Sequence, residues 1–144
     1  MSAKKLRPVD QRLCFLIYST SLAMTQTYKP LLEEIGLTYP QYLAMVVLWE
    51  QDGITVKELA TRLGQDSGSM TPLLKRLEAA GLVTRQRDPD DERSLSLRLT
   101  PAGQAMKEKA RKVDAAFAAA CDLDDTQVEQ LLAGISTLRR HLAD

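Results

Sequence analysis

The spacing of apolar residues predicts a long helix over residues 10–36. Leucine, isoleucine, alanine and methionine recur on one side of this segment at the three- and four-residue intervals of an α-helix. Gly36 stands where a helix stop belongs. A second helix is predicted to begin in "TYPQYLAMVVLW", with Thr38 as N-cap and Pro40 in the first turn, and to end near Gly53.

Two short helices are predicted next, joined by a tight polar turn. In "TVKELATRLG", Thr55 and Glu58 have the spacing of a capping box, and Gly64 supplies the stop. In "SMTPLLKRLEAAG" another helix closes on a glycine. Because proline is tolerated only in the first turn, this helix is expected to start near residues 68–71 or to be kinked at Pro72. The pattern is that of a helix-turn-helix.

The periodicity then changes from that of a helix to that of a strand. Residues 82–87 and 94–99 are predicted strands, and in the second one leucines alternate with serine and arginine, as in a half-buried strand. The polar residues 88–93, "DPDDER", form the predicted hairpin tip. A helix-turn-helix followed by a β-hairpin is a winged helix. We therefore expect a winged helix-turn-helix DNA-binding lobe over residues 38–100.

Two further amphipathic helices are predicted after the hairpin. Thr100 and Pro101 start the first, and the second runs from about Asp124 to His141. Together with the N-terminal helix, the segment 101–144 is longer than one winged helix needs to cover its core. Its apolar stripes would be exposed in a monomer, so we expect a homodimer built from both ends of the chain.

Composition narrows the class of protein. The 144 residues correspond to a single domain, 1–144, with ordinary globular composition, mainly α with a small β-hairpin wing. The formal net charge is zero, so any basic surface must be local. The longest apolar run is too short for a bilayer and no secretory signal is present, which favours a cytoplasmic protein without a membrane partner. Two separated cysteines and one histidine fit no metal site, and no cofactor motif is found.

The candidate DNA-binding surface is the start of the second short helix together with the wing. The stretch "DSGSMT" presents small polar side chains that can approach base edges, and nearby cations can reach phosphates. An arginine near the wing tip can enter a minor groove, while those of the first wing strand lie along the DNA backbone. Residues 57–98 hold eight basic and seven acidic side chains, so single cations there can also be ordinary solvated residues. The candidates are Asp66, Ser67, Ser69, Thr71, Lys75, Arg76, Arg85, Arg87 and Arg93.

Cys14, within the apolar stretch "QRLCFLIYS", has two interpretations. Free cysteine is often an inert buried hydrophobe, but its thiolate can also be a reactive nucleophile. Tyr18 lies one turn away on the same face, whereas fourteen residues of helix place Tyr28 about 21 Å from Cys14 within one chain. In an antiparallel or crossed dimer the tyrosines of the partner helix would return beside the thiol and favour its thiolate. By spacing alone, these tyrosines can also be ordinary interface residues.

Four motifs resemble those of a known family. They are "LCFLIYS", "YKPLLEEIGLTYPQYL", "DSGSMTPLLKRLEAAGLVTRQRDPDDERS" and "LTPAG". Together they resemble the organic hydroperoxide resistance repressors, a branch of the MarR-type winged-helix regulators. The resemblance begins near residue 10 and thins toward the C-terminus. It implies a homodimeric repressor that in its reduced state binds a pseudo-palindromic DNA operator and is not an enzyme.

The resemblance also implies roles for individual residues. Cys14 would be the sensor that an organic hydroperoxide oxidises to a sulfenic acid. Tyr28 and Tyr39 of the partner subunit would hydrogen-bond this sulfur. Cys121 lies where some members have a second cysteine that resolves the sulfenate as an intersubunit disulfide, although in its alanine-rich helix it can also be a small buried residue. The apolar surroundings of the sensor would be Phe15, Leu16, Ile17 and Tyr18.

Two other functions stay open on the sequence. A MarR-type repressor can be relieved by a reversible small phenolic ligand at the dimer interface, and such a protein would still respond after Cys14→Ser. A thiol peroxidase would instead consume hydroperoxide in steady turnover with a thiol reductant. The single histidine, His141, lies near the C-terminus and is poorly placed to serve a nucleophile, and a DNA-binding lobe has no use in an enzyme. The sequence therefore favours the redox-sensing repressor.

Overall fold

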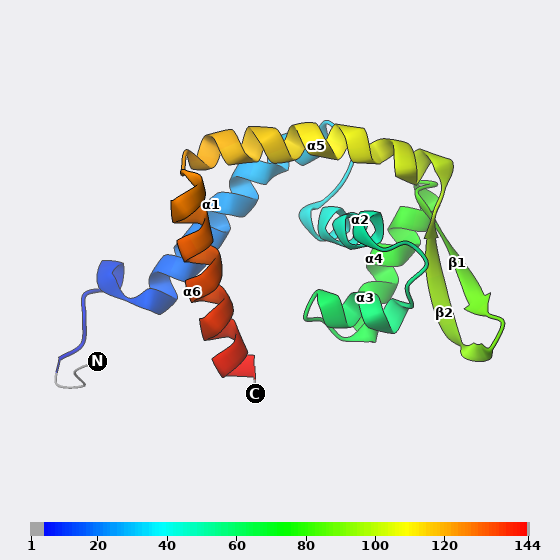
Figure 1. Ribbon diagram of the computed structural model, residues 1–144, viewed down its shortest axis with the longest axis horizontal. Helices are drawn as coiled ribbons and strands as arrows, with labels where there is room; N and C mark the ends of the chain where they lie inside the picture. Colours follow the sequence, from blue (N-terminus) through cyan, green and yellow to red (C-terminus); the bar gives the residue numbers. More distant parts are fainter. Residues whose placement is uncertain (1–4, 144) are drawn as a thin grey trace.

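The computed structural model describes residues 5–143, apart from the side chains of residues 88 and 92, and confirms the winged helix-turn-helix class (Figure 1). The elements are η1 (Val9–Gln11), α1 (Leu13–Glu33), α2 (Tyr39–Glu50), α3 (Val56–Arg62), α4 (Ser67–Ala79), β1 (Val83–Asp88), β2 (Asp91–Leu99), α5 (Pro101–Cys121) and α6 (Asp125–Ala143). The strands β1 and β2 pair antiparallel as the wing. The helices α3 and α4 form the helix-turn-helix.

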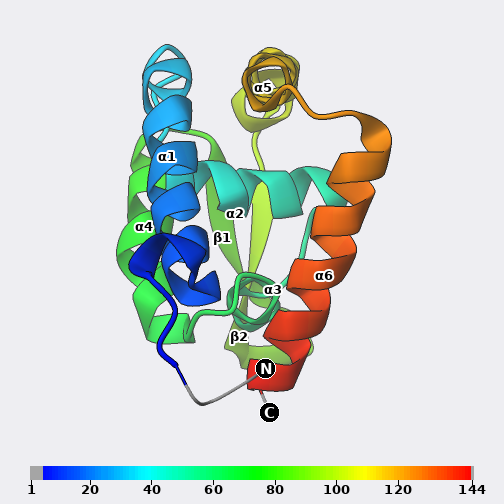
Figure 2. The same cartoon turned by 90° about the vertical axis from the view of Figure 1, so that its left-hand side faces the viewer.

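The long helix α5 connects two regions of the molecule. The wing and the helices α2, α3 and α4 gather near its N-terminal end, while α1 and α6 lie at its other end (Figure 1). Seen from the side, α1 and α6 stand on opposite sides of the molecule (Figure 2). The α1 helix packs on α5, and α2 contacts α1, α3, α4 and α5. The α2 helix thus packs against α1 from one region and against α3 and α4 from the other.

Local capping explains why these helices begin where the sequence predicts. Thr38 and Gln41 form a capping box at the start of α2: the Thr38 hydroxyl accepts the Gln41 N–H at 3.3 Å, and Gln41 Oε1 accepts the Thr38 N–H at 2.9 Å. At the start of α3, Thr55 accepts the Glu58 N–H at 3.0 Å, the first half of the predicted box. Gly36 has φ +73°, which confirms the predicted stop after α1.

The α4 helix begins one residue earlier than the predicted range. It starts at Ser67 because the Asp66 carboxylate caps it and accepts the Ser69 N–H at 2.9 Å and the Ser69 hydroxyl at 3.1 Å. Pro72 therefore lies inside the helix rather than in its first turn. The local cap offsets the missing N–H of the proline, which by itself disfavours a helix at that point.

The wing strands are longer than the sequence predicts. The turn between β1 and β2 consists of residues 89–90 instead of 88–93. The pairing shifts register beside this turn, so residues 92–94 of β2 form a bulge. Within the bulge the Asp91 carboxylate accepts the Arg93 N–H at 3.0 Å. A polar bulge has no apolar alternation, which is why periodicity does not reveal that the strands continue.

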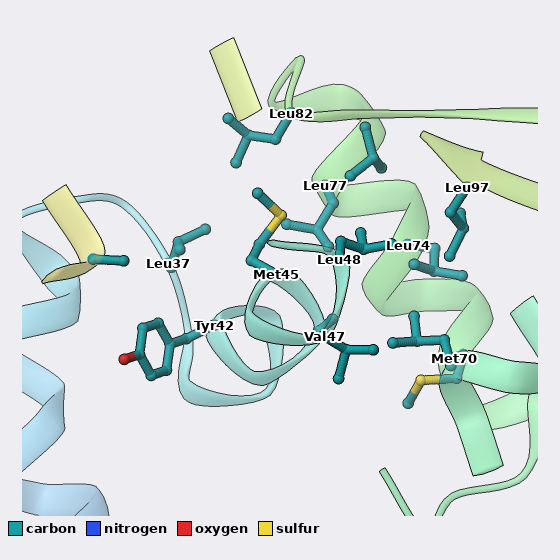
Figure 3. Packing of buried hydrophobic residues seen from close by; sticks show 14 of the residues in the cluster. Leu37, Tyr42, Met45, Val47, Leu48, Met70, Leu74, Leu77, Leu82 and Leu97 are labelled. Atoms are coloured by element: carbon teal, nitrogen blue, oxygen red, sulfur yellow. The ribbon is translucent and has the colours of Figure 1, made fainter. Parts of the chain in front are cut away.

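The hydrophobic core is centred in the winged-helix lobe (Figure 3) and extends to Tyr28 and Leu32 of α1 and to Ala110 and Val113 of α5. Met45 and Leu48 of α2 are fully buried against Leu74 and Leu77 of α4 and Leu97 of β2. Every one of these side chains is inaccessible to solvent, and interiors of this kind are close-packed and transmit displacement. A shift of α2 must therefore be followed by α4.

The terminal helices, in contrast, expose large apolar side chains. No residue of α6 is buried, and α1 buries only Tyr28 and Leu32. No helix within residues 5–143 is long and apolar enough to cross a membrane. The exposed faces fit the homodimer that the sequence predicts, since one chain leaves them uncovered. The large apolar residues exposed on α1 and α6 are Leu13, Leu16, Ile17, Tyr18, Leu22, Met24, Val128, Leu131, Leu132, Ile135 and Leu142.

Gly103 is the point where α5, α2 and the base of the wing meet. The Thr100 hydroxyl accepts the Gly103 N–H at 3.1 Å and caps α5, while the Gly103 carbonyl accepts the Trp49 indole N–H at 2.9 Å. A Cβ atom at residue 103 would overlap the backbone carbonyl oxygen of Leu82. The close approach of α5 to the backbone of Leu82, which follows α4 in the sequence, therefore requires glycine at residue 103.

We expect Gly103→Ala to lower the free energy of unfolding by about 1–3 kcal/mol, the usual cost of an overpacked site. Gly134→Ala in α6 is the matched control, because a Cβ there meets no atom within 4 Å and alanine favours a helix. Thermal unfolding of both variants measures the difference. Equal effects on Tm would mean that the approach to Leu82 imposes no constraint.

Candidate functional site

Three tyrosines and a phenylalanine gather where α1, α2 and α5 meet. The Tyr28 ring of α1 stacks on Phe117 of α5 with ring centroids 4.0 Å apart. Its centroid is 5.1 Å from that of Tyr39 and 5.6 Å from that of Tyr42, both in α2. Such distances are typical of favourable aromatic pairs. The structure thus brings together Tyr28 and Tyr39, which the sequence analysis proposes as partners of a sensor cysteine.

Tyr42 belongs to the same cluster and was missed by the sequence analysis. Its hydroxyl donates a hydrogen bond to the Asp114 carboxylate of α5. Figure 3 shows this hydroxyl pointing away from the labelled leucines of the lobe core. In "TYPQY", Tyr39 and Tyr42 are three residues apart and share one helix face, which is the signal that could have identified it. Phe117 was recognised only as part of an apolar stripe.

The environment of the cluster keeps its phenols protonated. Burial, followed by the nearby charges of Asp114, Tyr39 and Cys121, raises the pKa of Tyr28 to about 12. Burial also raises the pKa of Tyr39, and burial together with the hydrogen bond to Asp114 raises the pKa of Tyr42. The Tyr42 hydroxyl already donates its hydrogen bond to Asp114. The Tyr28 and Tyr39 hydroxyls have no acceptor within the described part of the chain, so they are available as donors.

The two cysteines occupy different positions relative to this cluster. Both are free and exposed, so neither belongs to the protomer core. Cys121 is the last residue of α5, one turn after Phe117, which stacks on Tyr28. Cys14 lies in the first turn of the continuous helix α1, so fourteen residues separate it from Tyr28, about 21 Å along the axis. One protomer therefore places Cys121, but not Cys14, beside the tyrosines.

The residues around Cys14 form an open apolar surface in one protomer. Leu16, Ile17 and Tyr18 are exposed, and Phe15 is half-buried. The apolar surroundings that the sequence predicts for the sensor are therefore not enclosed by a single chain. No group of three His, Cys, Asp or Glu side chains that could hold a metal occurs in the part of the chain that the structure describes.

The N-terminal end of α4 presents the predicted small polar side chains. The Ser69 backbone N–H and hydroxyl, bonded to the Asp66 carboxylate, hold the pKa of that carboxyl below its usual value. Asp66 thus remains ionised and fixes the first turn of the helix. Farther along α4 lie the two exposed cations of the prediction, Lys75 and Arg76. The exposed candidates of α4 are Asp66, Ser67, Ser69, Lys75 and Arg76, and Thr71 is half-buried.

The wing is attached to the lobe at both its strands. Arg85 of β1 forms an ion pair with Glu78 of α4, so its guanidinium is held against this helix. The Leu97 N–H of β2 donates to the Ile54 carbonyl at 2.8 Å. The other two arginine candidates, Arg87 and Arg93, are exposed farther along the hairpin. The wing therefore has a base fixed to the lobe and an outer part that exposes Arg87 and Arg93.

Comparison with known proteins identifies the family. The profile of the MarR family matches residues 37–95. The organic hydroperoxide resistance transcriptional regulator of Bacillus subtilis (strain 168) is 43% identical over 130 residues, which is 90% of this chain and 88% of that protein. The chain belongs to the MarR family. It is a transcriptional regulator and not an enzyme, as the sequence analysis predicts.

Solved structures of AbfR, a protein of Staphylococcus epidermidis, share the fold. Reduced AbfR bound to DNA is 32% identical with a TM-score of 0.77, covering 94% of this chain and 96% of that chain. Overoxidized AbfR bound to DNA is 34% identical with a TM-score of 0.77, covering 93% and 94%. Disulfide-formed AbfR, 34% identical, has a TM-score of 0.66 and covers 94% and 90%. This MarR-family chain thus resembles the DNA-bound forms of AbfR more than its disulfide form.

The raised pKa of Tyr28 makes stability depend on alkaline pH. A phenol whose pKa is higher in the folded state stabilises the fold below the unfolded pKa of 10, and this contribution is lost as the pH rises toward 12. We expect the free energy of unfolding to fall over this range, and to fall less steeply in Tyr28→Phe. Urea unfolding at pH 9, 10 and 11, with the exposed Tyr18→Phe as control, measures this. Parallel pH profiles for all three proteins would contradict it.

Proposed function

We propose that the protein is a redox-sensing repressor whose reduced homodimer binds a pseudo-palindromic DNA operator. Oxidation of Cys14 by an organic hydroperoxide, followed by an intersubunit disulfide with Cys121, releases the DNA. One observation carries this proposal: Cys121 follows Phe117, which stacks on Tyr28, by one turn of α5, while Cys14 is exposed about 21 Å away along α1. Each protomer therefore holds one half of a site that a second copy would complete.

The exposed apolar faces of α1 and α6 supply the dimer interface in this proposal. Their large hydrophobic residues are uncovered in one chain and would be buried against the same faces of a second copy. A crossed arrangement of the two α1 helices returns the partner subunit's Cys14 toward Tyr28 and Tyr39. The apolar residues around Cys14 then surround the sulfur and favour alkyl or lipid hydroperoxides over hydrogen peroxide.

The chemistry begins with the Cys14 thiolate, which two protonated phenols stabilise by donating hydrogen bonds to the sulfur. The sulfur attacks the O–O bond of the hydroperoxide and takes the terminal OH, becoming a sulfenic acid. The alkoxide leaves and takes up a proton from solvent, so it departs as the alcohol. The Cys121 thiol of the other subunit then attacks the sulfenic sulfur, forming the disulfide and releasing water.

In the reduced dimer the two α4 helices enter successive major grooves, about 34 Å apart. Ser67, Ser69 and Thr71 approach base edges from a helix start that Asp66 holds in shape. Lys75 and Arg76 contact phosphates, and the exposed Arg87 and Arg93 follow the DNA backbone and enter the minor groove. Arg85 supports this contact by fixing the wing against Glu78.

The disulfide supplies the free energy that shifts the dimer from its DNA-binding state to its released state. Moving a two-state equilibrium from one side to the other takes about 5.5 kcal/mol of bias, more than one lost hydrogen bond supplies and within reach of a covalent bond. The AbfR structures support this view, because overoxidized AbfR is found on DNA while the disulfide form differs most from the present fold. Cross-linking, rather than oxidation of the sulfur alone, is therefore the releasing event.

We expect one equivalent of cumene hydroperoxide per subunit to produce a covalent dimer in the wild type, and none in Cys14→Ser or Cys121→Ser. Non-reducing gels and intact mass measure the cross-link, and fluorescence anisotropy measures binding to a DNA duplex selected from a random library by the reduced protein. Cys121→Ser should stop at a mass gain of one oxygen. A wild type without any mass change would contradict the sensor role, and release of Cys14→Ser by a phenolic compound would favour a ligand-controlled repressor.

Substitution of Lys75 tests the placement of α4 on DNA. Lys75→Ala should weaken binding to all DNA sequences alike and reduce the slope of log K against log salt by about 1, since it removes one phosphate contact. Lys112→Ala is the matched control, because this exposed lysine lies on α5, outside the winged-helix lobe. Salt titrations of the reduced proteins measure both slopes. Equal slopes for the two variants would contradict the proposed docking of α4.

A further inference from the structure

The α2 helix is hydrogen-bonded to α5 at two points. The Tyr42 hydroxyl donates to Asp114, and the Trp49 indole N–H donates to the Gly103 carbonyl at 2.9 Å. Tyr42 and Trp49 are two turns apart on α2, and their acceptors are about three turns apart on α5. The earlier residue of α2 bonds the later residue of α5, so the two helices run in opposite directions with a bond at each end.

The two bonds have different surroundings. The Trp49 bond lies within the lobe, where Gly103 packs against the Leu82 backbone at the base of the wing. The Tyr42 bond lies at the aromatic cluster of α1, α2 and α5, since the centroid of the Tyr42 ring is 5.6 Å from that of Tyr28. Asp114 is one turn before Phe117, which stacks on Tyr28, and two turns before Cys121. Only the Tyr42 bond therefore connects the lobe to the part of α5 that carries Cys121.

Tyr42 is held firmly in this position. Tyr42 is 3% exposed, and its hydroxyl donates a hydrogen bond to Asp114. A hydrogen bond to a charged carboxylate is stronger than one between neutral groups. One turn further along α2, the buried Met45 and then Leu48 pack in the core with Leu74 and Leu77 of α4. A displacement that reaches Tyr42 is thus passed to α4.

We propose that the Tyr42–Asp114 hydrogen bond is the coupling element that makes α2, and with it the DNA-reading helix α4, follow α5 when Cys121 is drawn into the intersubunit disulfide. This inference rests on the proposed function. Tyr42 and Asp114 are positioning residues, because the Tyr42 hydroxyl donates to Asp114 rather than to the sulfur and neither residue belongs to the proposed DNA surface. Without the bond, only packing joins α2 to α5. Less of the α5 displacement then reaches α2 and α4, so they keep more of their DNA-binding arrangement.

The experiment compares operator affinity before and after complete cross-linking with cumene hydroperoxide in the full-length dimer. In Tyr42→Phe and Asp114→Ala we expect the ratio of oxidised to reduced Kd to fall at least about tenfold below that of the wild type, within the usual range of coupling between sites. The rate and yield of cross-linking should stay within about twofold. Asp114→Asn keeps an acceptor for the Tyr42 hydroxyl and should retain most of the coupling.

Trp49→Phe is the matched control, because it removes the other hydrogen bond between α2 and α5. It should lower Tm but leave the Kd ratio at the wild-type value, whereas a purely stabilising role of Tyr42 would make the two variants behave alike. A wild-type ratio in Tyr42→Phe, or an equal loss of coupling in Trp49→Phe, would overturn the inference while leaving the switch intact. A wild type that cross-links without losing affinity, or does not cross-link, would instead refute the proposed function itself. Should Tyr42→Phe not fold, the contrast between Asp114→Ala and Asp114→Asn decides the question.

Discussion

The burial of α2 between α5 and α4 is the constraint on which the rest of the structure depends. Its core residues Met45 and Leu48 are inaccessible to solvent, and the hydrogen bonds of Tyr42 and Trp49 both reach α5. A close-packed helix cannot shift without moving its neighbours. The position of α4 is therefore tied to α5, which extends from the wing to the aromatic cluster.

A formal net charge of zero does not fix how charge is distributed over the winged-helix lobe. Several carboxylates of the lobe bind groups of their own chain: Asp66 caps α4, Asp91 binds the wing bulge, and Glu78 pairs with Arg85. Their charge is partly neutralised by these local donors. Lys75 and Arg76 of α4 are exposed, so the charge at this surface depends on local arrangement rather than on overall composition.

The proposed sensor illustrates how a dimer can build reactivity from parts that are inert in one chain. Phenols that burial keeps protonated are suited to donate to a thiolate, and within one protomer the hydroxyls of Tyr28 and Tyr39 are directed to no described acceptor. Within one chain, Cys14 lies about 21 Å from Tyr28 along α1. Assembly, rather than local sequence, then determines whether the thiol reacts.

The sequence by itself determined the features that depend on neighbouring residues. These features depend on a few neighbouring residues, so the sequence predicts them. They are the helix caps such as Thr38 and Thr100, the change of period at the wing, and the motifs of the MarR family. Only the tertiary structure decided that Tyr42 bonds Asp114, 72 residues away, and that Arg85 is held against α4. Such contacts arise from packing between distant segments, which no local spacing encodes.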